Sequence, residues 1–128
     1  MGKFVVREVN SGFKFDLKAS NGQVVASSEV YNTRAACLKG VESVSKNAPV
    51  ANVENHTVEG YEVAKNPKFE IYADKANEFR FRLKAKNGEI IATSEGYKTM
   101  DSCKNGIESV RKNAENALIV DIEAATAD

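Results

Sequence analysis

The sequence predicts an α+β protein made of two tandem βββαβ repeats that fold as one compact unit. Three observations support this prediction. The second half of the 128-residue chain repeats the first, strand-like runs alternate between apolar and charged residues, and each half carries apolar residues at helical spacing.

The repeat sets the domain organisation. FKFDLKASNG at 13–22 corresponds to FRFRLKAKNG at 79–88, and GVESVSKNA at 40–48 corresponds to GIESVRKNA at 106–114. The alignment runs without a gap from Phe13 to Ala48, and more than half of its positions are identical, which chance does not produce. We therefore assign repeat 1 to residues 1–54, an inter-repeat linker to 55–67 and repeat 2 to 68–128.

Three strands are predicted at the start of each repeat. The first is a short run rich in β-branched and aromatic residues. The second places Phe, Phe, Leu and Ala on one face and mostly charged residues on the other, as half-buried strands do. The predicted ranges are 3–8, 13–19 and 24–28 in repeat 1, and 68–73, 79–85 and 90–94 in repeat 2.

An Asn-Gly pair separates the second and third predicted strands of both repeats, at 21–22 and at 87–88. Asn-Gly favours a two-residue type I′ turn, because both positions of that turn have positive φ. Such a hairpin sets Leu17 opposite Ala26 and Leu83 opposite Ala92, on the core face of the sheet.

A helix follows the third strand of each repeat, with Thr33 and Thr99 as predicted N-caps. Its apolar residues recur at steps of four, three and four, which places them on one face. They are Cys37, Val41, Val44 and Ala48 in repeat 1, and Cys103, Ile107, Val110 and Ala114 in repeat 2. Gly40 and Gly106 lie beside this stripe and indicate a close approach of helix and sheet. Leu118–Ile122 and the weaker Val50–Glu54 are the predicted fourth strands.

Composition narrows the function classes. Eighteen basic residues balance eighteen acidic ones, so no global field draws the chain to nucleic acid or to an anionic membrane. Two cysteines without a secretory signal favour the cytoplasm and buried free thiols, with a disulfide between them as the alternative. The single histidine, His56, lies in the linker, so the sequence predicts no metal site, and we expect no cofactor and no membrane partner.

The polar face of the second strand in repeat 2 is a candidate binding surface. Its cations are Arg80, Arg82, Lys84 and Lys86. Such a row suits a phosphate backbone, with Tyr72 on the neighbouring strand as a stacking residue. Hairpin pairing sets Glu89 opposite Lys86 and Glu95 opposite Arg80, which neutralises half of the row. Glu70 on the adjacent strand is a further candidate partner for these cations. A solvated sheet face is the competing interpretation.

The corners where the third strand leads into the helix are an alternative site. They carry Glu29 with Tyr31, and Glu95 with Tyr97. A carboxylate beside a phenol suits acid–base chemistry or ligand binding, and it also suits simple packing over the corner. This site predicts a concave pocket next to the corners that contains a carboxylate of perturbed pKa.

The motifs of repeat 2 resemble the YegP-like family, also called domain of unknown function 1508 or UPF0339. The matching segments are KFEIY at 68–72, FRFRLKAKNGE at 79–89, SEGY at 94–97 and GIESVRKNA at 106–114. Repeat 1 matches more loosely, with Asp16 in place of Arg82 and Val30 in place of Gly96. The resemblance implies one continuous antiparallel sheet with the C-terminal strands exchanged between the repeats. It also implies a monomeric chain that acts as an internal pseudo-dimer.

The family brings no established activity, so the function is predicted from the residues. They favour a non-catalytic interaction module that binds a protein or nucleic-acid partner. The alternative is a small-ligand-binding protein or enzyme that uses the duplicated Glu/Tyr corners. The sequence does not identify the partner.

Overall fold

The structure is a computed structural model that describes residues 2–122; residues 123–128, the end of predicted repeat 2, lie outside the described residues. The strands are β1 (Lys3–Val9), β2 (Gly12–Lys18), β3 (Val24–Ser27), β4 (Asn52–Asn55), β5 (Lys68–Ala73), β6 (Phe79–Lys84), β7 (Ile90–Thr93) and β8 (Leu118–Ile122). The helices are α1 (Arg34–Asn47), α2 (Met100–Ala114) and the short 3₁₀ turn η1 (Ala48–Val50). The fold is therefore α+β. Over residues 2–122, both long helices lack the length and apolar character needed to cross a membrane.

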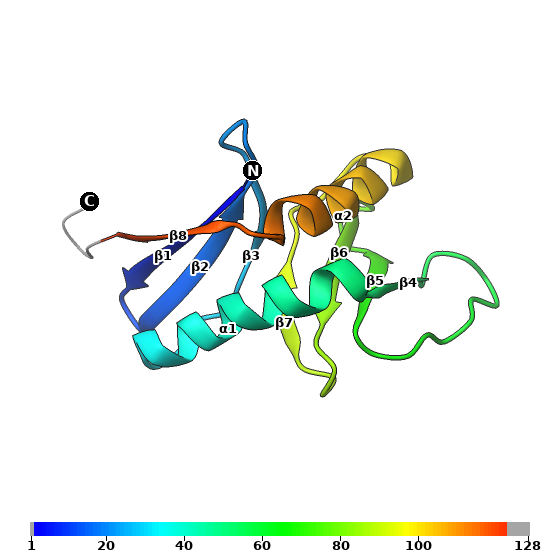
Figure 1. Cartoon of the computed structure of the whole chain (residues 1–128). Helices are drawn as coiled ribbons and strands as arrows, with labels where there is room; N and C mark the ends of the chain where they lie inside the picture. The colour runs from blue at the N-terminus through cyan, green and yellow to red at the C-terminus, as the bar shows by residue number, and fades with distance from the viewer. Residues whose placement is uncertain (1, 123–128) are drawn as a thin grey trace.

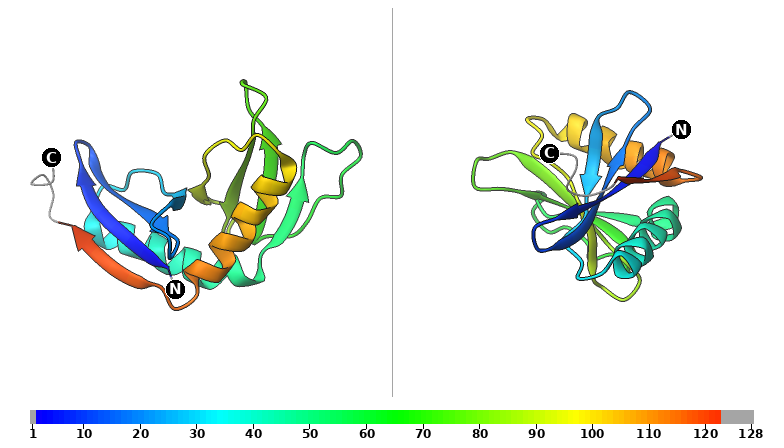
Figure 2. Two further views of the ribbon diagram at one scale, coloured as in Figure 1. Left: turned by 90° about the horizontal axis from the view of Figure 1, so that it is seen from above. Right: turned by 90° about the vertical axis from the view of Figure 1, so that its left-hand side faces the viewer.

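All eight strands form one sheet in the order β4-β5-β6-β7-β3-β2-β1-β8. The last strand of each repeat thus lies beside the first strand of the other: β8 pairs with β1, and β4 pairs with β5. Figure 1 shows the orange-red strand β8 at the blue strand β1, and the left view of Figure 2 shows the two strands side by side. Figure 2 shows the two halves of the sheet diverging from their junction at β3 and β7.

The sheet is mixed, so the prediction of a wholly antiparallel sheet is wrong at both edges. β1 and β8 run parallel, as do β4 and β5, whereas the other neighbouring strands are antiparallel. The segment 56–67, which connects β4 to β5, explains why these two strands run parallel. It carries the chain back to the end of the sheet where β4 began, so that β5 enters in the same direction, as a crossover between parallel strands must.

The hairpins differ from the predicted type I′ turn. The Gly22 N–H donates to the Ala19 carbonyl and the Ala19 N–H donates to the Gln23 carbonyl, which makes a three-residue loop with Gly22 at φ 86° as a bulge. A second irregularity follows between Leu17 and Lys18. The two irregularities cancel, so Leu17 lies opposite Ala26 as predicted. Gly88 and its hairpin repeat this arrangement, and Leu83 lies opposite Ala92.

The core lies between one face of the sheet and both helices (Figure 1). The predicted helix stripes are confirmed, because each of their eight residues is at most 1% exposed. The strands contribute Phe4, Val6, Phe15, Leu17, Phe69, Ile71, Phe81 and Leu83. Thr33 and Thr99 cap the helices as predicted, each accepting a backbone N–H bond at the third position of its helix.

Both cysteines lie in this core, and no disulfide joins them. The disulfide alternative is therefore wrong for this structure. Burial raises the pKa of the Cys103 thiol to about 11, so its reactive thiolate is scarce at neutral pH.

Candidate functional site

The two halves of the sheet meet at a narrow seam. The described pairing between β3 and β7 consists of one pair, Ser27 and Thr93, which occupy equivalent positions in the two repeats. A pseudo-twofold axis therefore passes between these two residues. To either side of it, the corner that follows β3 or β7 faces the hairpin of the other repeat.

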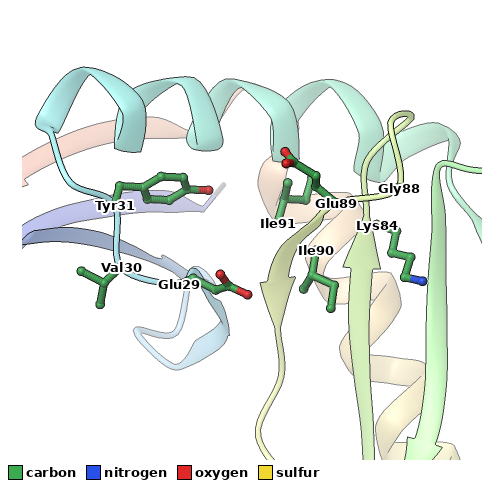
Figure 3. A pocket seen from close by; sticks show the side chains of 8 residues that line it. All are labelled: Glu29, Val30, Tyr31, Lys84, Gly88, Glu89, Ile90 and Ile91. Carbon is green, nitrogen blue, oxygen red and sulfur yellow. The ribbon is translucent and has the colours of Figure 1, made fainter.

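A pocket lies at each end of the seam. We call them the Tyr31 pocket, of about 480 Å³, and the Tyr97 pocket, of about 320 Å³. Both volumes fall within the range of small-ligand sites. The Tyr31 pocket (Figure 3) is lined by Glu29, Val30, Tyr31, Lys84, Gly88, Glu89, Ile90 and Ile91. The Tyr97 pocket is lined by Gln23, Val24, Val25, Glu95, Gly96 and Tyr97.

The two pockets are built from equivalent residues. Glu29 and Tyr31 correspond to Glu95 and Tyr97, and the aliphatic pair Ile90–Ile91 corresponds to Val24–Val25. Each pocket therefore combines the corner of one repeat with the hairpin of the other. The concave pockets predicted next to the corners are present, although the sequence did not reveal that the opposite repeat supplies the second wall.

Backbone pairing and ring packing hold each corner tyrosine in place. Tyr31 exchanges two backbone hydrogen bonds with Phe13, of 2.8 and 2.6 Å. Its ring stacks on Phe15, with centroids 6.3 Å apart, and its hydroxyl lies against Gly40 of α1. Repeat 2 packs Tyr97 in the same way. The tyrosine is thus both part of the helix–sheet contact and a wall of the pocket.

Electrostatics link the two walls of the Tyr31 pocket. Burial raises the pKa of the Tyr31 hydroxyl, and the neighbouring Cys37, Glu29 and Glu89 raise it further. Glu89 belongs to repeat 2, so its charge reaches the tyrosine of repeat 1. The hydroxyl consequently stays protonated at neutral pH, as a hydrogen-bond donor rather than a base.

The predicted row of cations lies on the outer face of the sheet, away from the helices. We call this row, Arg80, Arg82, Lys84 and Lys86, the cationic stripe. Arg80 Nε lies 2.6 Å from Asp74 Oδ2, and Arg82 Nε lies 2.7 Å from Glu70 Oε1. Lys84 Nζ lies 3.2 Å from the other oxygen of Glu70. These partners come from β5 and the β5–β6 turn, where Asp74 also accepts backbone N–H bonds.

The predicted partners Glu89 and Glu95 do not neutralise the stripe. Among the described residues, neither forms an ion pair with Lys86 or Arg80, because the hairpin bulge changes the pairing near Glu89 and Asp74 takes Arg80 instead. Lys86 lies beyond the end of β6 and is exposed. The guanidinium of Arg82 lies 4.6 Å from the centre of the Tyr72 ring, so Tyr72 is already stacked on a cation.

Sequence reasoning missed a group of buried charges next to the stripe. Glu54 of β4 and Glu70 of β5 lie directly opposite each other, and both carboxylates are buried. Lys68 Nζ lies 2.8 Å from Glu54 and 3.6 Å from Glu70, so one ammonium bridges the two like charges. The alternation of Lys68 and Glu70 was visible in the sequence, but the contact with Glu54 depends on the pairing of β4 with β5.

The linker closes over this group. The Ala64 N–H donates to Glu54, and the Ala64 carbonyl accepts from Lys68. His56 is hydrogen-bonded to Glu54, and its ring stacks on Tyr61. Burial raises the pKa of the Glu54 carboxyl, but hydrogen bonds from Lys68, His56 and Ala64 outweigh it and lower that pKa to about 2.

The same group contains ligand types that metals use. The ligand atoms of Glu54, His56 and Glu70 lie within 4.8 Å of one another. The ammonium of Lys68 already occupies the space between the two carboxylates, so a divalent cation would have to displace it. The residues therefore form a closed ion-pair network and do not fit a metal centre.

Comparison with known proteins places the chain among proteins of unknown function. A UPF0339 protein from the ptx operon 5′ region of Stutzerimonas stutzeri is 38% identical over 94% of this chain and 96% of its own length. The UPF0339 protein YegP of Yersinia pestis is 37% identical over 95% of this chain and 96% of its own length. A UPF0339 protein of Treponema denticola is 62% identical over 55 residues, which cover 43% of this chain and 95% of that protein, the length of one repeat.

Solved structures agree with the fold. The solution structure of yegP from E. coli, a protein of unknown function, matches with a TM-score of 0.78 at 30% identity, covering 95% of this chain and 93% of that one. The family model of the domain of unknown function DUF1508 matches residues 9–55 and again residues 74–121. The chain belongs to the DUF1508 family and carries that domain twice.

Proposed function

We propose that the chain is a non-catalytic binding module and that its binding surface is the pair of seam pockets. One observation carries the proposal: the fold builds the same pocket twice, each time from both repeats. Each pocket encloses a volume of small-ligand size, about 480 and 320 Å³, between two walls that come from different repeats. The two pockets suit a ligand or partner side chain that enters at the seam.

The groups that line the Tyr31 pocket favour binding over catalysis. The Tyr31 hydroxyl has a raised pKa, so it is not poised as a base at neutral pH. The ammonium of Lys84 is held by Glu70 on the outer face and is turned away from the corner (Figure 3). A nucleophile needs an adjacent activating base, and these two groups do not supply one.

Nucleic-acid binding by Arg80, Arg82, Lys84 and Lys86, with Tyr72, is the second candidate. The stacking of Arg82 on Tyr72 favours it, because a guanidinium over an aromatic ring offers a flat surface to a base. Phosphate contacts would have to compete with Glu70 and Asp74 for three of the four cations. The seam pockets, which need no existing ion pair to break, are the stronger candidate.

We also infer that the chain acts as a monomer. We keep the division into repeat 1 (1–54), linker (55–67) and repeat 2 (68–128). The last strand of each repeat pairs with the first strand of the other, so each repeat covers an edge of its partner's sheet. An internal pseudo-dimer of this kind needs no second chain to complete its sheet.

An amide-shift NMR titration with three ligands of different charge tests the proposed function. The ligands are n-butylammonium, 1-butanol and a mixed-sequence single-stranded oligonucleotide. Shifts confined to residues 29–31 with 88–91, and to 23–25 with 95–97, support the seam pockets. If only the oligonucleotide causes shifts, and these are confined to residues 80–86, the binding surface is the cationic stripe and not the seam pockets. The absence of localised shifts with all three ligands contradicts the proposal.

A further inference from the structure

We infer that the seam pockets take an alkylammonium group, the chemistry shared by a lysine side chain and a free polyamine. The inference rests on the proposed function and names its ligand class. It follows from three features of the pockets: carboxylates without partners, an apolar and aromatic wall, and the absence of an available cation among the lining residues.

The carboxylates at the pocket mouths have no partner in the described part of the chain. Glu29 and Glu95 are exposed, and within residues 2–122 their carboxylates form neither an ion pair nor a side-chain hydrogen bond. Asp74 and Glu70, by contrast, are each held by an arginine of β6. An unpaired carboxylate at the same place in both repeats therefore provides a point of attachment for a cation.

The walls suit the carbon chain that carries such a cation. Ile91 is 6% exposed and forms the floor of the Tyr31 pocket beside Ile90, while Val24 and Val25 occupy the equivalent places in the Tyr97 pocket. A lysine side chain buries its methylene groups on apolar surface and keeps its ammonium at a polar edge. The tyrosine ring beside the carboxylate adds a surface that attracts cations.

The pockets offer little to an anion. Among the described residues, Lys84 is the one cation that lines the Tyr31 pocket, and Glu70 neutralises it at 3.2 Å. In Figure 3 its ammonium points away from the carboxylate of Glu29. No cationic residue is found among those that line the Tyr97 pocket in the described chain. A negatively charged ligand would thus meet carboxylates without compensation.

Apart from Lys84, which Glu70 neutralises, the pockets differ in one charge, and this difference allows one pocket to be compared with the other. The Tyr31 pocket has a second carboxylate, Glu89, where the Tyr97 pocket has the uncharged Gln23. The amide of Asn87 lies 3.3 Å from the Glu89 carboxylate, a contact that leaves its charge in place. The Tyr31 pocket should therefore bind a cation more tightly than the Tyr97 pocket, and the difference should shrink as salt is raised.

The test compares ligands that differ only in the ammonium group. The first pair is n-butylammonium and 1-butanol. The second pair is the peptide acetyl-Gly-Val-Lys-Val-Gly-amide and the same peptide with norleucine in place of lysine. Spermidine is the free-polyamine arm. Each is titrated into the full chain while amide shifts are followed separately at the two pockets.

The expected result is that both cations bind more tightly than their uncharged partners. Glu29→Gln should raise the dissociation constant of the Tyr31 pocket about threefold to fivefold and leave the Tyr97 pocket unchanged. Glu95→Gln should do the reverse, so each variant is the control of the other. Tighter binding of the lysine peptide than of spermidine assigns the ligand to a protein side chain, and the reverse order assigns it to a free polyamine.

The inference is overturned if the uncharged ligands bind as tightly as their cationic partners. If 1-butanol nevertheless shifts the pocket amides, the seam pockets are still binding sites, and only the assignment of an alkylammonium ligand fails. If neither kind of ligand shifts the pocket amides, the proposed function fails together with the inference.

Discussion

The hydroxyl of Tyr31 lies against the α-carbon of Gly40, where a methyl group on residue 40 would overlap the hydroxyl oxygen. That methyl group would also touch the ring of Phe15 at 3.0 Å. Tyr97 and Gly106 have the same relationship in repeat 2. The glycine in the middle of each helix is therefore explained by the tyrosine, which sets the distance between helix and sheet and also lines a seam pocket.

Gly40→Ala should destabilise the protein by about 1–2 kcal/mol. Alanine favours the helix over glycine by about 1 kcal/mol, but an overlap this close lies in the upper part of the range of about 1–3 kcal/mol that overpacking a core costs, which leaves a net loss of about 1–2 kcal/mol. Chemical denaturation measures the change in the free energy of unfolding. Tyr31→Phe removes the overlapping oxygen, so Gly40→Ala should cost less in that background. An equal cost in both backgrounds would show that the hydroxyl is not the obstacle.

Lys68→Met should destabilise the protein by about 3–5 kcal/mol at neutral pH, because it leaves two buried carboxylates facing each other. The double variant with Glu54→Gln should be more stable than Lys68→Met alone, since it removes the buried charge of Glu54, which depends on Lys68, while Glu70 keeps Arg82 and Lys84. Urea unfolding of the three variants measures these differences. A double variant that loses the sum of the two single effects would contradict the assigned network.

The Glu54 carboxyl should make stability depend on pH in acid. Its pKa is lowered from 4.5 to about 2 in the folded chain, so its ionised form stabilises the fold above about pH 4.5. That contribution is lost as the pH falls from about 4.5 toward 2. The free energy of unfolding of the parent chain should therefore exceed that of Glu54→Gln at pH 6 by about 2–3 kcal/mol. The two values should converge near pH 2, whereas a constant difference would refute the assignment.

Neither cysteine should react with iodoacetamide in the folded protein at pH 8. Both thiols are fully buried, and burial raises the pKa of Cys103 to about 11. Mass spectrometry counts the added groups. Lys39→Cys places a thiol at an exposed position of α1 and should be labelled readily, as should the parent chain in denaturant. Rapid labelling of the native parent chain would place a cysteine outside the core.

The repeats should not fold as independent monomers. Residues 1–56 contain β4 without its partner β5, and residues 57–128 contain β8 without its partner β1. Separately produced fragments should form a complex when mixed, with a gain in helical signal by circular dichroism and the summed mass by light scattering. Two fragments that each remain folded, monomeric and unchanged on mixing would contradict the exchange of strands.

Local patterns predicted the elements well, because each pattern has a local cause. Thr33 caps a helix through its own hydroxyl, and the stripe from Cys37 to Ala48 faces the core because helical periodicity places it there. The turn at Gly22 was predicted with the wrong type. The Asn-Gly pair is compatible with both a two-residue turn and a three-residue loop, and the register of Leu17 is the same in both.

Long-range arrangements were harder to predict. The corner residues Glu29 and Tyr31 were found from duplication, but the facing wall at Ile90–Ile91 depends on how the two halves of the sheet meet at Ser27. Two partners of the cationic stripe, Glu89 and Glu95, were predicted on the neighbouring hairpin strand, and among the described residues they form no ion pair with it. Glu70, predicted as a further partner on the strand on the other side of β6, binds both Arg82 and Lys84.

The most direct test of the seam pockets uses two nitroxide radicals, 4-amino-TEMPO and its uncharged 4-hydroxy analogue, which differ in one ammonium group. The cationic radical should broaden the amide signals of the Tyr31 pocket, residues 29–31 and 88–91, most strongly. The signals of the Tyr97 pocket, residues 23–25 and 95–97, should follow, and those of the outer face of β6 should be broadened least. The uncharged radical should broaden the same signals less. Equal broadening by both radicals, or broadening that follows residues 80–84 instead, would contradict the claim that the seam between the repeats is a binding site for cations.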